Sequence, residues 1–267
     1  MSPALPTYTD LVATYRNEAA ANDDLWRDFT AATWADPLLA SHRRHVEAHQ
    51  LGFGDAAFHS LWRMLLHEAH ARFGTPRALE IGIFKGQVIS LWALLAARQG
   101  FDIRISALGP LAGQPAPRSS KFNRLRYWLD ARYRERVRNG DFYAEEDYEA
   151  IVREHFRHHG VEFDSVRLFR GYSTDTALLT RMKDETFHIV YVDGDHTYAG
   201  ARHDFLMFGP KVVPGGWLVA DDAGAELPGS AFGKGHPSVS QAARELPALG
   251  FRNVFNIGHN RVYERIA

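Results

Sequence analysis

Residues 77–107 read RALEIGIFKGQVISLWALLAARQGFDIRISA. The stretch from Arg77 to Phe84 is a short apolar run with a glycine, which predicts a buried strand. Gln87 to Gln99 is rich in Leu and Ala and predicts a helix, and Phe101 to Ala107 predicts a second strand. A strand, a helix and a strand within about 30 residues form a βαβ unit, and such units build parallel sheets.

The same alternation resumes nearer the C-terminus. Strands are predicted at Val166–Arg170, Phe187–Asp193 and Trp217–Ala220, and helices at Asp175–Lys183, Tyr198–Val213 and Ser238–Leu246, with a turn at Pro214-Gly-Gly. The runs Phe251–Ile257 and Asn260–Ile266 are close enough to pair as an antiparallel hairpin. We therefore expect an α/β fold, a doubly wound Rossmann-like sheet of seven strands with an antiparallel C-terminal hairpin.

Two further segments surround this sheet. The N-terminal segment predicts helices at Tyr8–Ala21, Asp24–Ala32, Pro37–His49 and Ala56–Phe73. We expect residues 1–74 to form a helical cap and 75–267 to form the sheet domain, with an insertion at about 108–164. The insertion is strongly basic between Ser120 and Arg138, which fits either a solvated helix face or a patch for phosphate or an acidic partner.

Composition narrows the function classes. The 267 residues are 45% hydrophobic and 24% charged, which is ordinary for a globular protein, and the net charge of −1 argues against a dedicated nucleic-acid binder. The longest apolar run, Leu91–Ala97, is far shorter than the roughly 20 residues of a bilayer span. No signal peptide is apparent and there is no cysteine, so thiolate chemistry is excluded and a cytoplasmic location is expected.

Ligands of open parallel sheets bind beyond the carboxyl ends of the strands. Four carboxylates are expected at two such ends, from Asp193, Asp195, Asp221 and Asp222. Helix capping can compensate some of this charge, and a bound Mg²⁺, Mn²⁺ or Ca²⁺ can compensate more. The first strand is followed by Gly82 and Gly86, a spacing that supports neither a dinucleotide fingerprint nor a P-loop.

At these residues the sequence resembles the class I S-adenosylmethionine-dependent methyltransferases. Glu80-x-Gly82-x-x-x-Gly86 is similar to their first motif. Residues 192–198, VDGDHTY, together with residues 211–222, KVVPGGWLVADD, resemble the branch of metal-dependent small-molecule and sugar O-methyltransferases. The resemblance covers about Arg77 to Arg265, less the insertion, and implies S-adenosylmethionine and a divalent cation, with Mg²⁺ first, as cofactors.

The resemblance implies a role for each matching residue. Cofactor contacts are implied for Glu80, Gly82, Gly86, Ser173, Thr174 and Asp193; metal binding for Asp193, Asp221 and Asp222; and the general base for His196, with Asp195 as the rival base. One departure is visible: such enzymes usually end the second strand with an acid that binds the ribose, and residues 106–109 read SALG. How the ribose is held is left open.

The hypothesis from sequence is O-methylation of a hydroxyl on a small molecule, a sugar or glycosylated natural product first and a phenol or catechol second. The alternatives are a metal-independent methyltransferase, a non-catalytic binding domain with this fold, and a nucleic-acid methyltransferase that uses the basic insertion. Homo-oligomerisation is left open. His42, His45 and His49 fall near one helical face, a spacing that can bind a metal, although exposed helix histidines are commoner.

Overall fold

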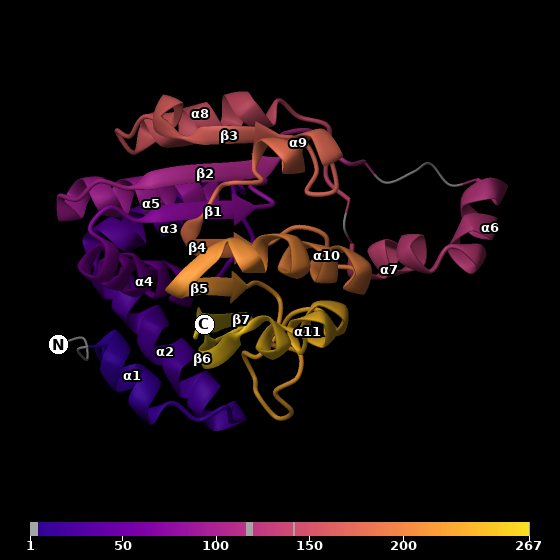
Figure 1. Ribbon diagram of the computed structural model, residues 1–267. Coiled ribbons are helices and arrows are strands. Elements are labelled where there is room, and N and C mark those ends of the chain that lie inside the picture. Colours follow the sequence, from indigo (N-terminus) through magenta and orange to yellow (C-terminus); the bar gives the residue numbers. More distant parts are fainter. Residues whose placement is uncertain (1–4, 116–119, 141, 267) are drawn as a thin grey trace.

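The structure is a computed structural model that describes residues 5–115, 120–140 and 142–266. Its centre is a seven-stranded sheet in the order β3-β2-β1-β4-β5-β7-β6 (Figure 1). The strands are β1 (Arg77–Ile81), β2 (Arg104–Gly109), β3 (Arg167–Arg170), β4 (Phe187–Val192), β5 (Val212–Ala220), β6 (Phe251–Ile257) and β7 (Asn260–Arg265). Strands β1 to β5 are parallel, and β7 runs antiparallel between β5 and β6. The predicted fold class is confirmed.

The central strand β4 is buried on both sides. Ile189 and Tyr191 pack into one hydrophobic core, and Val190 and Val192 pack into the other. Successive side chains of a strand point to opposite faces, so a strand covered by helices on both faces needs apolar residues throughout. This requirement explains the uninterrupted apolar centre of the β4 sequence.

Helices cover each face of the sheet. One core is shared with α1 (Tyr8–Thr14), α2 (Ala19–Ala35), α3 (Pro37–His49), α4 (Ala57–Phe73), α5 (Gln87–Gln99) and α8 (Tyr148–His158). The other is shared with α9 (Thr176–Arg181), α10 (Tyr198–Phe208) and α11 (Pro237–Ala243). The N-terminal helices therefore share the first core with the sheet, and the division into a cap and a sheet domain remains a prediction.

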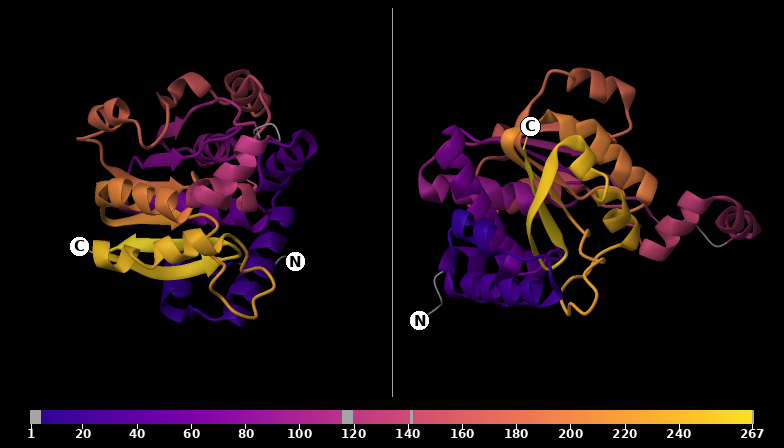
Figure 2. Two further views of the ribbon diagram at one scale, coloured as in Figure 1. Left: turned by 90° about the vertical axis from the view of Figure 1, so that its right-hand side faces the viewer. Right: turned by 60° about the horizontal axis from the view of Figure 1, so that its bottom comes forward.

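The insertion carries α6 (Lys121–Leu129) and α7 (Ala131–Asn139), and Figures 1 and 2 show α6 standing away from the rest of the molecule. Ser120 and Asp130 cap the two helices by accepting backbone N–H groups. Phe122, Trp128 and Leu129 of α6 are more than two-thirds exposed. Of these two helices, only α7 contributes residues to the site described below.

The helix expected at Tyr8–Ala21 is wrong in its extent. The chain leaves α1 at Tyr15 in an extended conformation and re-enters a helix at Ala19. Between them, Asn17 accepts a hydrogen bond from the Asn256 side chain of β6, at 2.8 Å. This contact between distant parts of the chain holds the break, and local spacing does not reveal it.

Pro214-Gly-Gly, expected to be a turn, lies within the bounds of β5. The register with β4 shifts there, from Phe187 opposite Val212 to Ile189 opposite Trp217. The segment is thus an irregularity within the strand, and Gly215 takes a positive φ of 75° that favours glycine. Among the helices of the described ranges, none is both long and apolar enough to cross a membrane.

Candidate active site

A cavity of about 690 Å³ opens at the carboxyl ends of β1, β2, β4 and β5. Its walls also include residues of the N-terminal segment, of α7 and of the loop before α11. The site residues expected from sequence that line it are Glu80, Gly82, Ser173, Thr174, Asp193, Asp195, His196, Asp221 and Asp222. Gly86 is the one expected residue that does not line this cavity; it precedes α5 with a positive φ of 79°.

Gly82 is required by the close approach of β1 to β4. Its φ is 97°, and a Cβ atom added there would lie 1.8 Å from the backbone oxygen of Asp193. No side chain fits at such a distance, and the conformation itself disfavours other residues. The loop after β1 therefore exposes bare backbone to the cavity, which is what the approach of a ligand needs.

Glu80 is a buried acid beside this loop. Its side chain is 2% exposed, and Oε2 has no hydrogen-bond partner within the described part of the chain. Burial, followed by the charge of Asp193, raises the pKa of Glu80 well above its usual value. A ligand that brings a positive charge or an N–H donor would compensate this carboxyl.

Three carboxylates and three histidines meet at the floor of the cavity. The Nε2 atom of His196 lies 3.4 Å from Asp193 Oδ1 and 3.5 Å from Asp222 Oδ2. His236 Nε2 lies 3.4 Å from Asp222 Oδ2, and its ring stacks on that of His196. His259 Nε2 lies 3.3 Å from Asp221 Oδ1. His236 and His259 could not be positioned from sequence, because each lies in a loop without a spacing motif.

The carboxylates and histidines of this cluster change one another's pKa values. Burial, the charge of Asp221 and that of Asp222 raise the pKa of Asp193, against the opposing contribution of His196. Burial also raises the pKa of Asp222. Although burial opposes the charge on both partners, His259 keeps the pKa of Asp221 below its usual value, and the pKa of His259 rises to about 10. Asp221 and His259 therefore form a buried ion pair, while two carboxyls beside them lack full compensation.

The cluster offers ligand atoms for a cation. In two sets the candidate atoms lie within 4.8 Å of one another: His196, Asp222 and His236 form one, and Asp221, Asp222 and His259 form the other. Asp222 belongs to both sets and has a φ of 53°, a left-handed conformation that Asp tolerates better than most residues. Carboxylate oxygens suit hard divalent cations, and imidazole suits transition metals, so this donor set fits a divalent metal.

Asp195 has partners that differ from those of His196. It accepts a 2.5 Å ion-pair contact from Arg132 of α7 and a 2.9 Å hydrogen bond from the backbone N–H of Thr197. Burial raises the pKa of Asp195, but these two donors outweigh it and the net shift is downward. The His196 carbonyl is held by Asn139 of α7 and by Ser238, at 2.9 and 2.6 Å.

The basic insertion thus reaches the cavity. Arg132 and Arg136 line it, and Arg136 donates to the Oε1 atom of Gln114 at 2.9 Å. Gln114 lies a few residues beyond β2, near the position where the ribose acid is missing. The basic run predicted either a solvated helix face or a patch for an acidic partner, and a charge run alone does not tell which arginines face a ligand.

The N-terminal segment supplies an aromatic wall. Trp26 stacks on Phe232 with ring centroids 3.7 Å apart, and Phe53 and Phe58 also line the cavity. Of the other aromatic residues in this segment, Phe29 and Trp62 are fully buried in the core. Helical spacing does not separate Trp26 from Phe29 in α2, or Phe58 from Trp62 in α4, because each pair lies in one helix three or four residues apart.

Comparison with known proteins identifies the family. A model of a methyltransferase-domain family matches residues 79–223, more than half of the chain. No curated protein matches in sequence. In the solved structure of the O-methyltransferase NovP, the similarity covers 80% of this chain and 81% of NovP, with a TM-score of 0.57 and 19% identity.

Two other solved structures share the fold over nearly their full length. The calicheamicin methyltransferase CalS11 has a TM-score of 0.52 and 15% identity, over 99% of each chain. The O-methyltransferase TomG from Streptomyces achromogenes, in complex with SAM, has a TM-score of 0.52 and 14% identity, over 92% of this chain and 99% of TomG. With the strand order and the family match, these similarities lead to one conclusion: the chain belongs to the class I S-adenosylmethionine-dependent methyltransferase family.

Proposed function

We propose that the protein transfers a methyl group from S-adenosylmethionine to a hydroxyl of a small molecule, with a divalent cation bound to its acidic cluster. The observation that carries the proposal is the meeting of Asp193, Asp222 and His196 at the floor of one cavity. A carboxylate pair with a neighbouring imidazole can bind a cation and accept a proton from an acceptor hydroxyl.

Cofactor binding is proposed for the β1 side of the cavity. The bare backbone at Gly82 allows close approach. Oε2 of Glu80, which has no hydrogen-bond partner among the described residues, suits the amino group of the cofactor's methionine part. Ser173 and Thr174, beyond β3, are proposed to border the adenine. In place of the missing ribose acid, Gln114 offers an amide that Arg136 orients.

Metal binding is proposed for Asp193, Asp221 and Asp222, with His236, which lies beside Asp222, as a further donor. S-adenosylmethionine supplies the methyl group as a sulfonium, and a divalent cation supplies a positive charge that lowers the pKa of a hydroxyl. Because Mg²⁺ prefers oxygen ligands whereas imidazole suits transition metals, the carboxylates favour Mg²⁺ and the histidines widen the choice.

His196 is the proposed general base. The hydroxyl oxygen of the acceptor attacks the methyl carbon, the carbon–sulfur bond breaks, and the hydroxyl proton passes to the imidazole of His196. Asp195 is less suited to this task, since Arg132 and Thr197 already occupy its oxygens. Positioning the acceptor in line with the methyl group contributes several kcal/mol to such a reaction.

For the acceptor, we propose a sugar or a glycosylated natural product, with a phenol or catechol second. The stacked Trp26–Phe232 pair and Phe53 provide flat apolar surface next to the carboxylates. Aromatic faces with a few polar groups are typical of sites for ring-shaped small molecules. An acceptor with two neighbouring oxygens would allow both to approach the cation.

The direct test is methyl transfer from radiolabelled S-adenosylmethionine to a panel of sugars, glycosides and catechols. The proposal expects turnover on at least one class, loss of turnover in chelator, and recovery with Mg²⁺ or Mn²⁺. Transfer to nitrogen acceptors alone, or no transfer to any hydroxyl, would contradict it.

A metal-independent methyltransferase is the second candidate. It is favoured by the Asp221–His259 ion pair, which compensates one carboxylate without a cation. Undiminished turnover in chelator would select it.

A further inference from the structure

A histidine cluster lies away from the acidic site, where α3, α4 and the end of α8 meet. It comprises His42, His45, His49, His59, His155, His158 and His159. From sequence, exposure was the commoner expectation for the α3 histidines, and for His42 this is wrong: its side chain is fully buried. The proposed reaction uses none of these residues.

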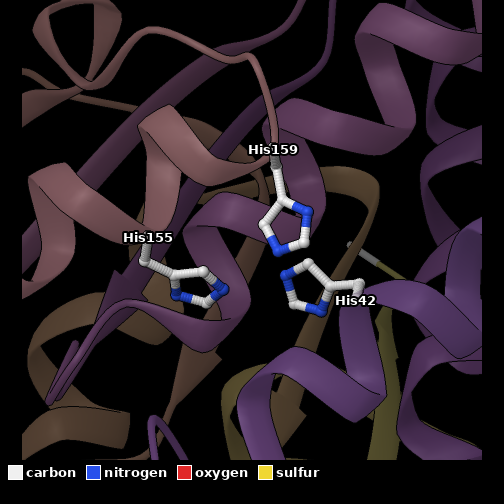
Figure 3. Close-up of side chains that lie close together, drawn as sticks. All are labelled: His42, His155 and His159. Atoms are coloured by element: carbon white, nitrogen blue, oxygen red, sulfur yellow. The ribbon is translucent and has the colours of Figure 1, made fainter. Parts of the chain in front are cut away.

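Three of the rings converge in a small space. The ring centroid of His42 lies 5.1 Å from that of His155 and 4.6 Å from that of His159. Figure 3 shows a ring nitrogen of each turned toward the space between them. One nitrogen from each residue can be chosen so that all three lie within 4.8 Å of one another. Two of the three, His42 and His155, are at most 1% exposed.

The hydrogen bonds around His42 prepare it as a ligand. Its Nδ1 atom lies 3.0 Å from His59 Nε2, and its Nε2 atom lies 3.0 Å from Ser90 Oγ. In the tautomer that carries the proton on Nδ1, this atom donates to His59. The lone pair of Nε2 then faces Ser90 Oγ, a contact that a metal bound at Nε2 would replace. Metal-binding histidines commonly donate their second N–H in this way.

His159 contributes a buried nitrogen without a partner. Its Nε2 atom is inaccessible to solvent and has no hydrogen-bond partner within residues 5–115, 120–140 and 142–266. A metal ion, which binds imidazole in its neutral form, would give this buried nitrogen a partner.

We propose that His42, His155 and His159 bind a zinc ion, which fastens the end of α8 to α3. Zinc takes imidazole nitrogens at about 2.0–2.1 Å, so the nitrogens of a tetrahedral site lie about 3.4 Å apart. The three candidate nitrogens lie within 4.8 Å of one another, so zinc binding would draw them closer together. Mg²⁺ and Ca²⁺ are excluded at this site because the three donors include no oxygen.

The position of the site gives it a structural effect. Val152 of α8 packs against Gly86, since a Cβ on that glycine would lie 3.0 Å from Val152. Gly86 ends the loop after β1, so a zinc ion that fixes α8 also fixes one wall of this loop. Zinc would thereby stabilise the fold at a distance from the acidic cluster.

The test measures zinc binding by the full chain after a chelator has removed bound metal. Excess Mg²⁺ is present to compete at the acidic site, and binding is followed by calorimetry and by the melting temperature. His159→Gln is the chosen variant, because His159 lies at the end of α8 and is only partly buried. We expect wild type to bind one zinc ion at this site and to gain several degrees in melting temperature. His159→Gln should lose at least about 100-fold in zinc affinity, since disturbing an outer partner alone costs about 10- to 100-fold.

Three controls identify the ligands. His67→Gln, at an exposed histidine of α4, should bind zinc as wild type does. Asp222→Asn, which disturbs both cation sets at the acidic site, should keep this zinc equivalent, so failure of this proposal and failure of the proposed function can be told apart. His158→Gln should also keep it, although His45, His158 and His159 form a second close set.

Cobalt gives an independent readout. Co²⁺ in place of zinc should show the intense visible absorption of a tetrahedral site, and His155→Gln should abolish it. The proposal is overturned if no zinc binds, if His159→Gln binds as tightly as wild type, or if His158→Gln loses zinc while His155→Gln retains it.

Discussion

At the scale of single residues, the contacts around His196 distinguish it from Asp195 as the proposed general base. His196 lies within 3.5 Å of two carboxylates, its ring stacks on His236, and its carbonyl is held from two sides. Asp195, one residue earlier, is held by Arg132. Asp193, Asp195, Asp221 and Asp222 were expected together because they follow two neighbouring strands, and the role of His196 was implied by the family resemblance. The sequence did not predict His236 or His259, whose loops are brought in only by the folded chain.

Replacing His196 by Gln should reduce kcat by about 10²- to 10⁴-fold, the usual contribution of a positioned base. Affinity for S-adenosylmethionine should change little, because the residues proposed to hold it lie on β1 and after β3. Steady-state kinetics with calorimetry of cofactor binding measure both quantities. Asp195→Asn serves as the comparison. If Asp195→Asn lost more kcat than His196→Gln, Asp195 and not His196 would be the general base.

His259→Gln removes one partner of a buried ion pair. His259 and Asp221 side chains are only 14% and 11% exposed, so the remaining carboxylate would be poorly solvated. Breaking such a pair typically costs about 3–5 kcal/mol of folding free energy. Urea unfolding at neutral pH should therefore show a loss of a few kcal/mol, and His67→Gln should show none. A loss below about 1 kcal/mol would mean that the pair does not stabilise the fold.

At the scale of elements, local patterning identified the strands well. The apolar runs of β1 and β4 and the short turn between β6 and β7 are local signals, and the hairpin and the parallel order follow from them. The break between α1 and α2 depends on Asn256, far along the chain. The burial of His42 likewise depends on α8, which arrives from the insertion. Such features depend on contacts that spacing within one element does not encode.

The start of β4 provides a pH-dependent link between elements. His188 accepts the backbone N–H of Arg77 on its Nδ1 atom, at 3.0 Å, and stacks on Phe73 of α4. Burial, with the charge of Arg77, lowers the pKa of His188 from 6.5 to about 4. The unfolded chain binds this proton below pH 6.5 and the folded chain does not, so stability falls as pH drops from 6.5 toward 4. The slope from this one group is up to about 1.4 kcal/mol per pH unit.

The measurement is urea unfolding of wild type and His188→Gln at pH 7.0 and 5.5. Gln can accept the same hydrogen bond but does not titrate in this range. As the pH is lowered, the free energy of unfolding should fall less steeply in the variant. The difference in slope should be up to about 1.4 kcal/mol per pH unit, the value for one proton. Equal slopes in both proteins would show that His188 titrates normally in the folded state.

At the scale of the whole molecule, the insertion supplies part of the wall of the active-site cavity. Arg132, Arg136 and Asn139 of α7 all line the cavity, although the insertion separates β2 from β3 in the sequence. The basic run was expected to be either a solvated helix face or a patch for an acidic partner, and the structure has features of both. Arg126 pairs with Asp130 of its own segment, whereas Arg132 pairs with Asp195 of the site. Sequence located the insertion but could not tell that it folds back over the strand ends.

Arg132→Ala should loosen this arrangement with little effect on global stability. The Arg132 side chain is 53% exposed, and exposed ion pairs contribute about 0–1 kcal/mol. Hydrogen exchange in α7 should speed up several-fold, because the contact of Arg132 with Asp195 is lost. Arg27→Ala, which removes an exposed pair in α2, is the matched control and should leave α7 unchanged. Equal exchange in all three proteins would mean that the contact does not hold α7.

The central claim is that the cavity at the ends of β1 and β4 binds S-adenosylmethionine beside a cation site. The most direct measurement is a calorimetric titration of the purified chain with S-adenosylmethionine and S-adenosylhomocysteine, with and without Mg²⁺. We predict one binding site with a micromolar Kd for both ligands, despite the absence of an acid after β2. No binding under either condition, by a chain that is shown to be folded, would contradict the enzymatic function and favour a non-catalytic domain with this fold.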